Sequence, residues 1–145
     1  MVTDKIRVIV RPLRKTDLAS ALNLTGSLIT PEEMASLNSG SPSAPCFVAE
    51  AEGRVVGFNL ARVLHVGIPL SKICVIQGIV VHSDYRRLGI GEKLVEAVFG
   101  YCVKHSIEVV RTLVDENDNR LRQFVEHVGF RRSMVANYDR TVDST

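Results

Sequence analysis

Apolar and polar residues follow one another in short runs along this chain, and most runs alternate with the period of a β-strand. Six such segments are bounded by turn residues, and we expect a strand in each: Ile6 to Val10, Cys46 to Glu50, Val55 to Val63, Lys72 to Val81, Glu108 to Val114 and Met134 to Thr141. Glu52-Gly53 predicts a hairpin turn between the second and third strands, and His65 to Pro69 predicts a break before the fourth. Within the fourth strand, Ile73-Cys74-Val75-Ile76 is apolar at every position, which predicts a central strand covered on both faces.

Other segments carry apolar residues at helical spacing. The longest runs from about Gly91 to His105, and its apolar stripe consists of Ile90, Leu94, Val95, Val98, Phe99 and Cys102. Thr16-Asp17 and Thr30-Pro31-Glu32-Glu33 are typical starts of two short helices, the second ending near Gly40. A further helix is expected from Asn119 to Val128. This order of elements predicts a single α/β domain over residues 1–145, with a mixed central sheet flanked by helices on both faces.

The composition narrows the class of protein. The chain has 145 residues, of which 46% are hydrophobic and 23% are charged, as in a globular protein. Its net charge of +2 is too small for nucleic acid to be the main partner. No run approaches the ~18 apolar residues that a membrane helix needs, and Met1 to Pro12 lacks the apolar stretch of a signal peptide. We therefore expect a cytoplasmic protein without nucleic-acid or membrane partners.

The cysteines and histidines are not spaced as metal ligands. Cys46, Cys74 and Cys102 are far apart, odd in number and without a Cys-x-x-Cys pair. The histidines at positions 65, 82, 105 and 127 do not form a metal-binding motif either. We expect structural roles for these residues and no metal cofactor.

The segment from Val81 to Gly91 joins the fourth strand to the long helix and carries the most informative pattern. Gly89 and Gly91 flank one residue at the start of the helix, where unpaired amides and the positive end of the helix dipole attract phosphate. Two adjacent arginines add cations suited to a pyrophosphate. The spacing fits neither a Walker A loop nor the dinucleotide fingerprint, which needs a small residue where Leu94 stands. A tight turn with surface arginines, and a nucleotide-binding domain built on the same turn, remain as alternatives.

As a longer motif, Arg86-Arg87-Leu88-Gly89-Ile90-Gly91 resembles the Q/R-x-x-G-x-G/A acetyl-CoA signature of the GNAT superfamily of N-acetyltransferases. The residues before it resemble the family's V-x-P-x-Y-R, with Ser83 in place of proline. Downstream, the segment from Asp118 to Phe130 is similar to the family's N-x-x-A-x-x-L/F-Y-x-x-x-G-F. The similarity covers nearly the whole chain. It implies the acyl-CoA N-acyltransferase fold with a short C-terminal end, and an enzyme that transfers an acetyl group from acetyl-CoA to a primary amine.

The resemblance also implies which residues hold acetyl-CoA. Backbone at Ile79, Val80 and Val81 would bind the pantetheine arm, in a gap where the central strand and the next strand part. The residues implied for the pyrophosphate are Arg86, Arg87, Leu88, Gly89, Ile90 and Gly91. The candidates from the second motif are Asn117, Asp118 and Asn119. Gly78 suits the strand irregularity that begins such a gap, or else it is a packing glycine beneath a helix.

The catalytic side chains depart from the usual pattern of the family. The implied chemistry is direct attack of a neutral amine on the thioester, with a main-chain N–H near Val80 as oxyanion donor. Gln77 and Gly78 stand where many relatives carry a glutamate, and Val125 stands where many carry a proton-donating tyrosine. Tyr138 is therefore the candidate proton donor to the CoA thiolate. These departures support an alternative function, a catalytically weak acetyl-CoA-binding sensor or scaffold of the same fold.

Several other residues carry expectations of their own. Thr25 to Pro45 occupies the place where the family varies its acceptor site, and its few charges leave a protein N-terminus, a lysine and a small amine all open as acceptors. Tyr85 is expected to be a structural anchor, and His82 to be solvated at a strand end. Relatives fit two more strands after the position of Phe130, so we expect a second copy of this chain to complete the short sheet as a homodimer.

Overall fold

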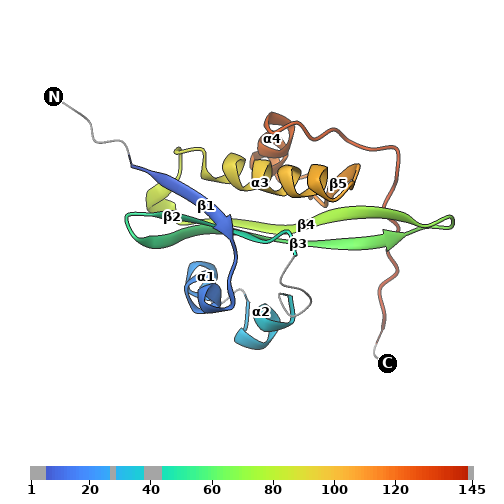
Figure 1. The fold of residues 1–145 in the computed structure, drawn as a ribbon. Coiled ribbons are helices and arrows are strands. Elements are labelled where there is room, and N and C mark those ends of the chain that lie inside the picture. The colour runs from blue at the N-terminus through green and yellow to red at the C-terminus, as the bar shows by residue number, and fades with distance from the viewer. Residues whose placement is uncertain (1–5, 27–28, 38–43, 144–145) are drawn as a thin grey trace. The chain divides into compact units, whose positions relative to one another are not determined.

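The computed structural model describes residues 6–26, 29–37 and 44–143, without the side chains of residues 35–37. Its centre is a five-stranded sheet in the order β1-β2-β3-β4-β5 (Figure 1). The strands are β1 (Val8–Pro12), β2 (Phe47–Ala51), β3 (Arg54–Val66), β4 (Ser71–Val81) and β5 (Val109–Thr112). The first four are antiparallel to their neighbours, and β5 runs parallel to β4. The predicted mixed sheet is confirmed.

Helices cover both faces of this sheet. The helices are α1 (Leu18–Thr25), α2 (Pro31–Leu37), α3 (Ile90–Lys104) and α4 (Asn119–His127), with 3₁₀ turns at Lys15–Asp17 and Ser83–Tyr85. The first two lie on one face and α3 lies on the other (Figure 1). No helix in the described ranges is long and apolar enough to span a membrane.

Each face of the sheet has its own apolar cluster. The α1/α2 face buries Ala21 and Met34 against Phe58 and Leu60 of β3. The α3 face buries Ile90 and Leu94 against Val56, Ala49 and Ala51. Val56 and Leu60 belong to opposite faces although four residues separate them, because a bulge in β3 shifts its register against β2 at Ala49/Glu50.

A partly buried ion pair fixes the start of the α1/α2 layer. Both guanidinium nitrogens of Arg11 on β1 bind the Asp17 carboxylate, at 2.8 and 2.9 Å. Arg11 also binds Glu50 of β2 at 2.7 Å, and the Arg14 amide donates to Asp17 at 2.7 Å. The hydrogen bonds from Arg11 hold the pKa of Asp17 below its ordinary value. Asp17 was expected to cap α1, but its side chain binds β1 and the backbone of the preceding turn instead.

The chain divides into two compact units, residues 1–113 and 114–145. The second unit contains α4, whose N-cap is Asp118; its carboxylate accepts from Leu121 N at 3.0 Å. A single domain over residues 1–145 stays a prediction. The expected end of the second helix near Gly40 lies outside the described residues.

Two strand predictions were wrong. Met134 to Thr141 forms no strand, although its residues alternate, because a strand needs a hydrogen-bonding neighbour and no described strand pairs with this segment. The expected break at His65 is also absent, since β3 continues to Val66 and pairs His65 with Lys72 of β4. The β3–β4 hairpin is therefore long, and Figure 1 shows it running past α1 and α2.

Candidate functional site

The two halves of β4 differ in their neighbours. Residues Ile73 to Ile76 pair with β3 on one side and with Val109 to Thr112 of β5 on the other. Gly78 to Val81 continue to pair with β3, but residues 77–81 have no partner on the β5 side within the described chain. The hydroxyl of Thr112 donates to the carbonyl of Ile76 at 3.1 Å, at the last rung before the strands part. A gap therefore opens beside residues 77–81.

A bulge marks the start of this gap. Leu60 of β3 lies opposite Gly78, and Ala61 lies opposite Ile76, so Gln77 is the extra residue on β4. A Cβ atom added to Gly78 would meet nothing within 4 Å, so this residue is not a packing glycine beneath a helix. The irregularity expected here is confirmed, one residue before the glycine, and it leaves Gln77 exposed.

The peptide groups facing the gap belong to Ile79 and Val81. The amide of His82 donates to the Val56 carbonyl of β3 at 2.7 Å, and backbone direction alternates along a strand. The peptide group of Val80 is therefore directed at Phe58, its partner in the register. Val80 was expected to offer its backbone to a ligand, but its peptide group is directed at β3, and those of Ile79 and Val81 face the gap.

The turn after β4 contains backbone amides that have no acceptor within α3. Arg87 and Gly89 have positive φ values of 68° and 73°, and Gly89 is the N-cap of α3. The first hydrogen bond of the helix runs from Lys93 N to Gly89 O at 3.0 Å. The amides of Ile90 and Gly91 consequently have no acceptor within the helix. Such consecutive amides at a helix N-terminus form a ready site for phosphate.

The side chains of this turn divide into exposed and buried groups. Arg86, Arg87 and Leu88 are exposed, whereas Ile90, the first residue of α3, is buried. The two guanidinium groups are thus available to an anion held by the amides. The buried isoleucine fixes the first turn of the helix against the sheet.

Residues of the β2–β3 hairpin hold the turn in place. The Tyr85 hydroxyl donates to the Glu52 carboxylate at 2.5 Å, and this bond raises the pKa of Tyr85. The guanidinium of Arg54 lies 5.6 Å from the centre of the Tyr85 ring. The anchoring role expected for Tyr85 is confirmed. Its partners were not found from the sequence, since nothing local links them to position 85.

His82 supports the same turn and does not act in the gap. Its Nδ1 accepts from the Asp84 amide at 3.1 Å, and its Nε2 lies 3.2 Å from Arg54 Nη2. Its ring packs edge-on against Tyr85 at 5.6 Å. Because Nδ1 accepts a backbone hydrogen bond and the ring packs within the turn, His82 has a structural role.

The second unit contains the remaining predicted site residues. Asp118 is occupied as the cap of α4, while Asn117 and Asn119 have exposed side chains. The Asn117 amide donates to the Asp115 carboxylate at 2.8 Å, which shapes the turn before the helix. Tyr138 is 94% exposed and lies outside any strand.

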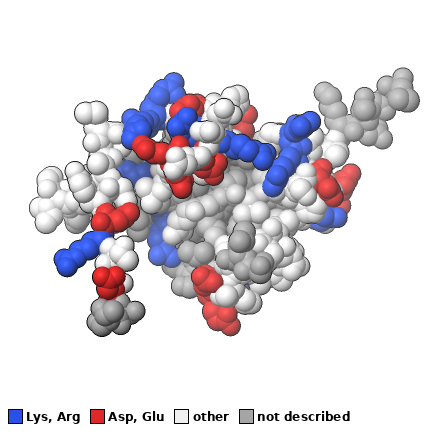
Figure 2. Space-filling view, turned by 180° about the vertical axis from the view of Figure 1, so that it is seen from behind, with Lys and Arg blue, Asp and Glu red and all other residues white. Residues whose placement is uncertain are grey.

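The start of α3 also lines a groove. It is an open groove of about 730 Å³ between β1 and α3, lined on one side by Val8 and Val10. Its other wall carries Glu92, Lys93 and Glu96 and reaches Gly89 in the turn before α3. Figure 2 shows basic and acidic side chains intermixed on the surface, and among the described residues no group of three or more His, Cys, Asp or Glu side chains is placed to hold a metal.

Solved structures share this fold. An aminoglycoside N-acetyltransferase, AAC(6')-Iy, in complex with CoA is 18% identical and superposes with a TM-score of 0.82, covering 97% of this chain and 99% of that one. An aminoglycoside acetyltransferase from an uncultured soil metagenomic sample, in complex with sisomicin, is 21% identical with a TM-score of 0.74 and coverages of 94% and 97%. A transcriptional regulator from Bacillus halodurans C-125 is 17% identical with a TM-score of 0.75 and coverages of 93% and 100%.

The sequence itself was compared with protein families and with curated proteins. No curated protein matches it. The model of the acetyltransferase (GNAT) family matches residues 17–130, which include the gap beside β4, the turn before α3 and the start of α4. The chain belongs to the acetyltransferase (GNAT) family.

Proposed function

We propose that this chain is an acetyl-CoA-dependent N-acetyltransferase that acetylates a primary amine by direct attack. The observation that carries the proposal is the succession of two features along the chain: the edge of β4 without a β5 partner, and the amides at the start of α3 without an acceptor in the helix. A linear molecule with a diphosphate at one end and amide groups along its length matches both features. Acetyl-CoA is such a molecule, and it is a substrate here.

The residues present fit acetyl-CoA in two places. The amides of Ile90 and Gly91, with the guanidinium groups of Arg86 and Arg87, would hold the pyrophosphate. The peptide groups of Ile79 and its second neighbour Val81 would bind the pantetheine arm as an added strand would. From the second unit, we propose the side chains of Asn117 and Asn119 and the cap residue Asp118 as further contacts.

The reaction requires few groups from the protein. The amine nitrogen attacks the thioester carbon, the C–S bond breaks, the ammonium proton leaves to solvent and the thiolate takes up a proton. A gap-facing amide of β4 would stabilise the oxyanion, and exposed Gln77 would orient a water that accepts the amine proton. Alignment of two reactants can contribute about 7–11 kcal/mol, more than one general base at ~10²–10⁴-fold. Activity without a glutamate on β4 is therefore physically reasonable.

We propose Tyr138 as the proton donor to the thiolate. Its phenol is 94% exposed, so it is accessible to a ligand. Tyr138→Phe removes only the hydroxyl, and we expect kcat to fall about 100-fold or more while acetyl-CoA affinity stays unchanged. Stopped-flow thiol release checks this, and an unaltered kcat would remove Tyr138 from the mechanism.

Release of the CoA thiol from acetyl-CoA, followed with a thiol reagent and a panel of amines, tests the proposal. The protein's own thiols will not obscure this assay, because burial raises the pKa of Cys74 to about 12 and raises those of Cys46 and Cys102. Amine-dependent release with saturation in acetyl-CoA is the expected result. Tight acetyl-CoA binding without release on any amine would point instead to a sensor or scaffold.

A further inference from the structure

Two arginines flank β4 in one row of the sheet, at the point where the gap begins. Val75 of β4 lies opposite Arg62 of β3 and opposite Arg111 of β5. Residues that are direct neighbours across strands present their side chains on the same face. All three side chains therefore lie on one face, beside the last paired rungs before β4 and β5 part.

This row belongs to the α1/α2 face. Arg62 lies two residues beyond Leu60, whose side chain is in the cluster with Ala21 and Met34. The charge of Arg62 also lowers the pKa of Cys46, a member of the same cluster, against the larger effect of burial. The row thus lies on the opposite face from α3, where the hairpin runs past the helices.

Neither arginine has a counter-ion among the described residues. Arg62 is exposed and Arg111 is half-buried, and neither forms an ion pair or hydrogen bond with any side chain that the structure describes. Residues 35–43 contain no Asp or Glu. With strands ~4.8 Å apart, the two Cα atoms are about 10 Å apart, so the guanidinium groups repel each other across Val75 unless an anion lies between them.

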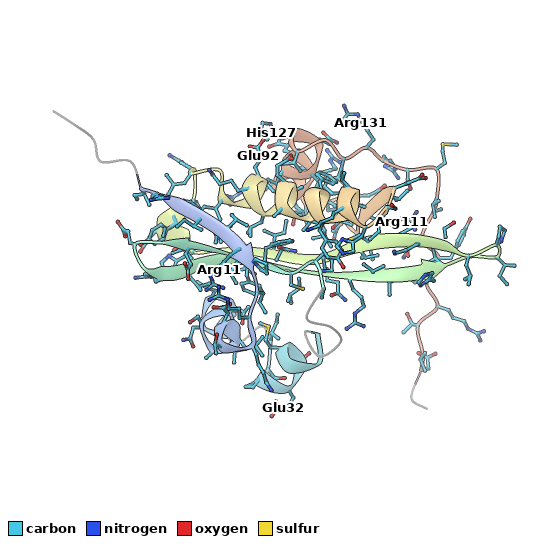
Figure 3. The ribbon with its side chains drawn as sticks, viewed as in Figure 1. Arg11, Glu32, Glu92, Arg111, His127 and Arg131 are labelled. Atoms are coloured by element: carbon cyan, nitrogen blue, oxygen red, sulfur yellow. The ribbon has the colours of Figure 1, made fainter. Side chains whose placement is uncertain are left out.

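The carboxylates near the α1/α2 face are bound to other groups or point away from the sheet. Glu33 accepts from the Thr30 amide at 3.0 Å within a capping box. Asp17 and Glu50 are both bound by Arg11. Figure 3 shows Glu32 on the side of α2 away from the sheet. The cationic row is therefore not neutralised from the neighbouring helices.

We infer that Arg62 and Arg111 bind an anionic group, a carboxylate or a phosphate, on the amine acceptor. The inference rests on the proposed acetyl transfer and names its acceptor class: a small amine that also carries an anion. Four residues separate Val75 from Ile79, so the row lies about 13 Å along β4 from the gap-facing peptide. An arginine side chain spans part of that distance, and an acceptor a few bonds long spans the rest.

The proposed acceptor class differs from that of the aminoglycoside acetyltransferases that share this fold. Aminoglycosides carry several ammonium groups, which two uncompensated guanidinium groups repel. An acceptor with one amine and one anion gains two charge-assisted hydrogen-bonding partners at the same place. Specificity then comes from repulsion of the polycation as well as from attraction of the anion.

Matched ligand pairs test the inference. Phosphoethanolamine against ethanolamine isolates a phosphate, and β-alanine against its amide isolates a carboxylate. Each is titrated calorimetrically into CoA-saturated protein, with sisomicin as a polycationic ligand. We expect the anionic member of at least one pair to bind ten times or more tighter than its neutral partner, and the preferred pair tells phosphate from carboxylate.

Arginine variants locate the effect. Arg62→Gln and Arg111→Gln should each weaken the anionic ligand about tenfold and leave the neutral ligand and CoA unchanged. Arg7→Gln, an exposed arginine before β1 at the other edge of the sheet, is the control with the same change of charge. Thermal melting of each variant confirms that it folds.

The outcomes distinguish two failures. Equal affinities within both pairs, tighter binding of sisomicin, or an anion preference that survives both arginine variants would overturn the inference. Absence of heat on titrating CoA would overturn the proposed function instead. The same ligand pairs are then titrated into the free protein, where the presence or absence of an anion preference still decides the role of the row.

Discussion

The two halves of β4 have similar aliphatic sequences and opposite surroundings. Ile73 to Ile76 is enclosed by β3 and β5, and three of its four residues are buried. Residues 77–81 keep only β3 as a neighbour, and none of them is fully buried. Each backbone N–H and C=O group of a strand needs a hydrogen-bonding partner. Where one edge of a strand is left without its partner, the fold offers those hydrogen bonds to a ligand.

In residues 77–81 of β4, the edge that faces β3 is as important as the edge that faces the gap. β3 fixes the direction of each peptide group, and the Tyr85–Glu52 bond fixes the turn that follows. A ligand therefore meets backbone groups already held in place, so little conformational entropy is lost on binding. The following changes test this division of β4, from the largest expected effect to the smallest.

Gly89→Glu should have the largest effect, a loss of acetyl-CoA affinity on the order of a thousandfold, or about 4 kcal/mol. The carboxylate enters the turn proposed for the diphosphate, where a like charge repels it. Gly89→Gln is the matched control, because both side chains impose the same strain at a φ of 73°. Isothermal titration of both variants checks this, and equal affinities for the two would contradict the placement of the diphosphate.

Two proline variants should distinguish the amides of β4 that are directed at β3 from those that face the gap. Val80→Pro removes an amide directed at β3, and we expect a loss of about 3 kcal/mol in the free energy of unfolding. Ile79→Pro removes an amide that faces the gap, so its stability should stay close to that of Ile79→Ala while acetyl-CoA affinity falls about tenfold. Denaturant melts and titrations measure both quantities. The reverse pattern would show that the Val80 amide faces the gap and that the Ile79 amide is directed at β3.

Asp17→Asn should affect stability alone, by about 2 kcal/mol at pH 7. The pKa of Asp17 is lowered in the folded protein, chiefly by Arg11. The ionised carboxylate therefore stabilises the fold at every pH above its ordinary value near 3.9, and the contribution is lost as pH falls through the lowered pKa. Urea melts should show a constant difference from wild type above about pH 5 that narrows in acid. A changed acetyl-CoA affinity would mean that the α1/α2 layer and the gap are coupled.

Features carried by neighbouring residues could be predicted from the sequence. The hairpin turn at Glu52-Gly53, the stripe on α3 and the glycine turn at Gly89 all depend on residues a few positions apart. The fold class followed from their order, and the signature before α3 identified the family.

Features that depend on register could not be predicted in the same way. An irregularity was expected at Gly78, but only the register places the bulge at Gln77 and shows which peptide groups face the gap. The row across Val75 exists only because β3, β4 and β5 align at that position. The Glu52 partner of Tyr85 is 33 residues away in the chain. The strand expected from Met134 to Thr141 failed for a related reason, since alternation indicates a strand but does not supply its neighbour.

Amide hydrogen exchange along β4, with and without acetyl-CoA, tests the central claim most directly. Exchange at Ile79, Val81, Ile90 and Gly91 should slow on binding, because these amides gain acceptors from the ligand. Exchange at Ile73 to Ile76 should hardly change, because β3 and β5 already pair that half. Unchanged exchange at Ile79 and Val81, or new protection at the groove beside β1 instead, would contradict the account.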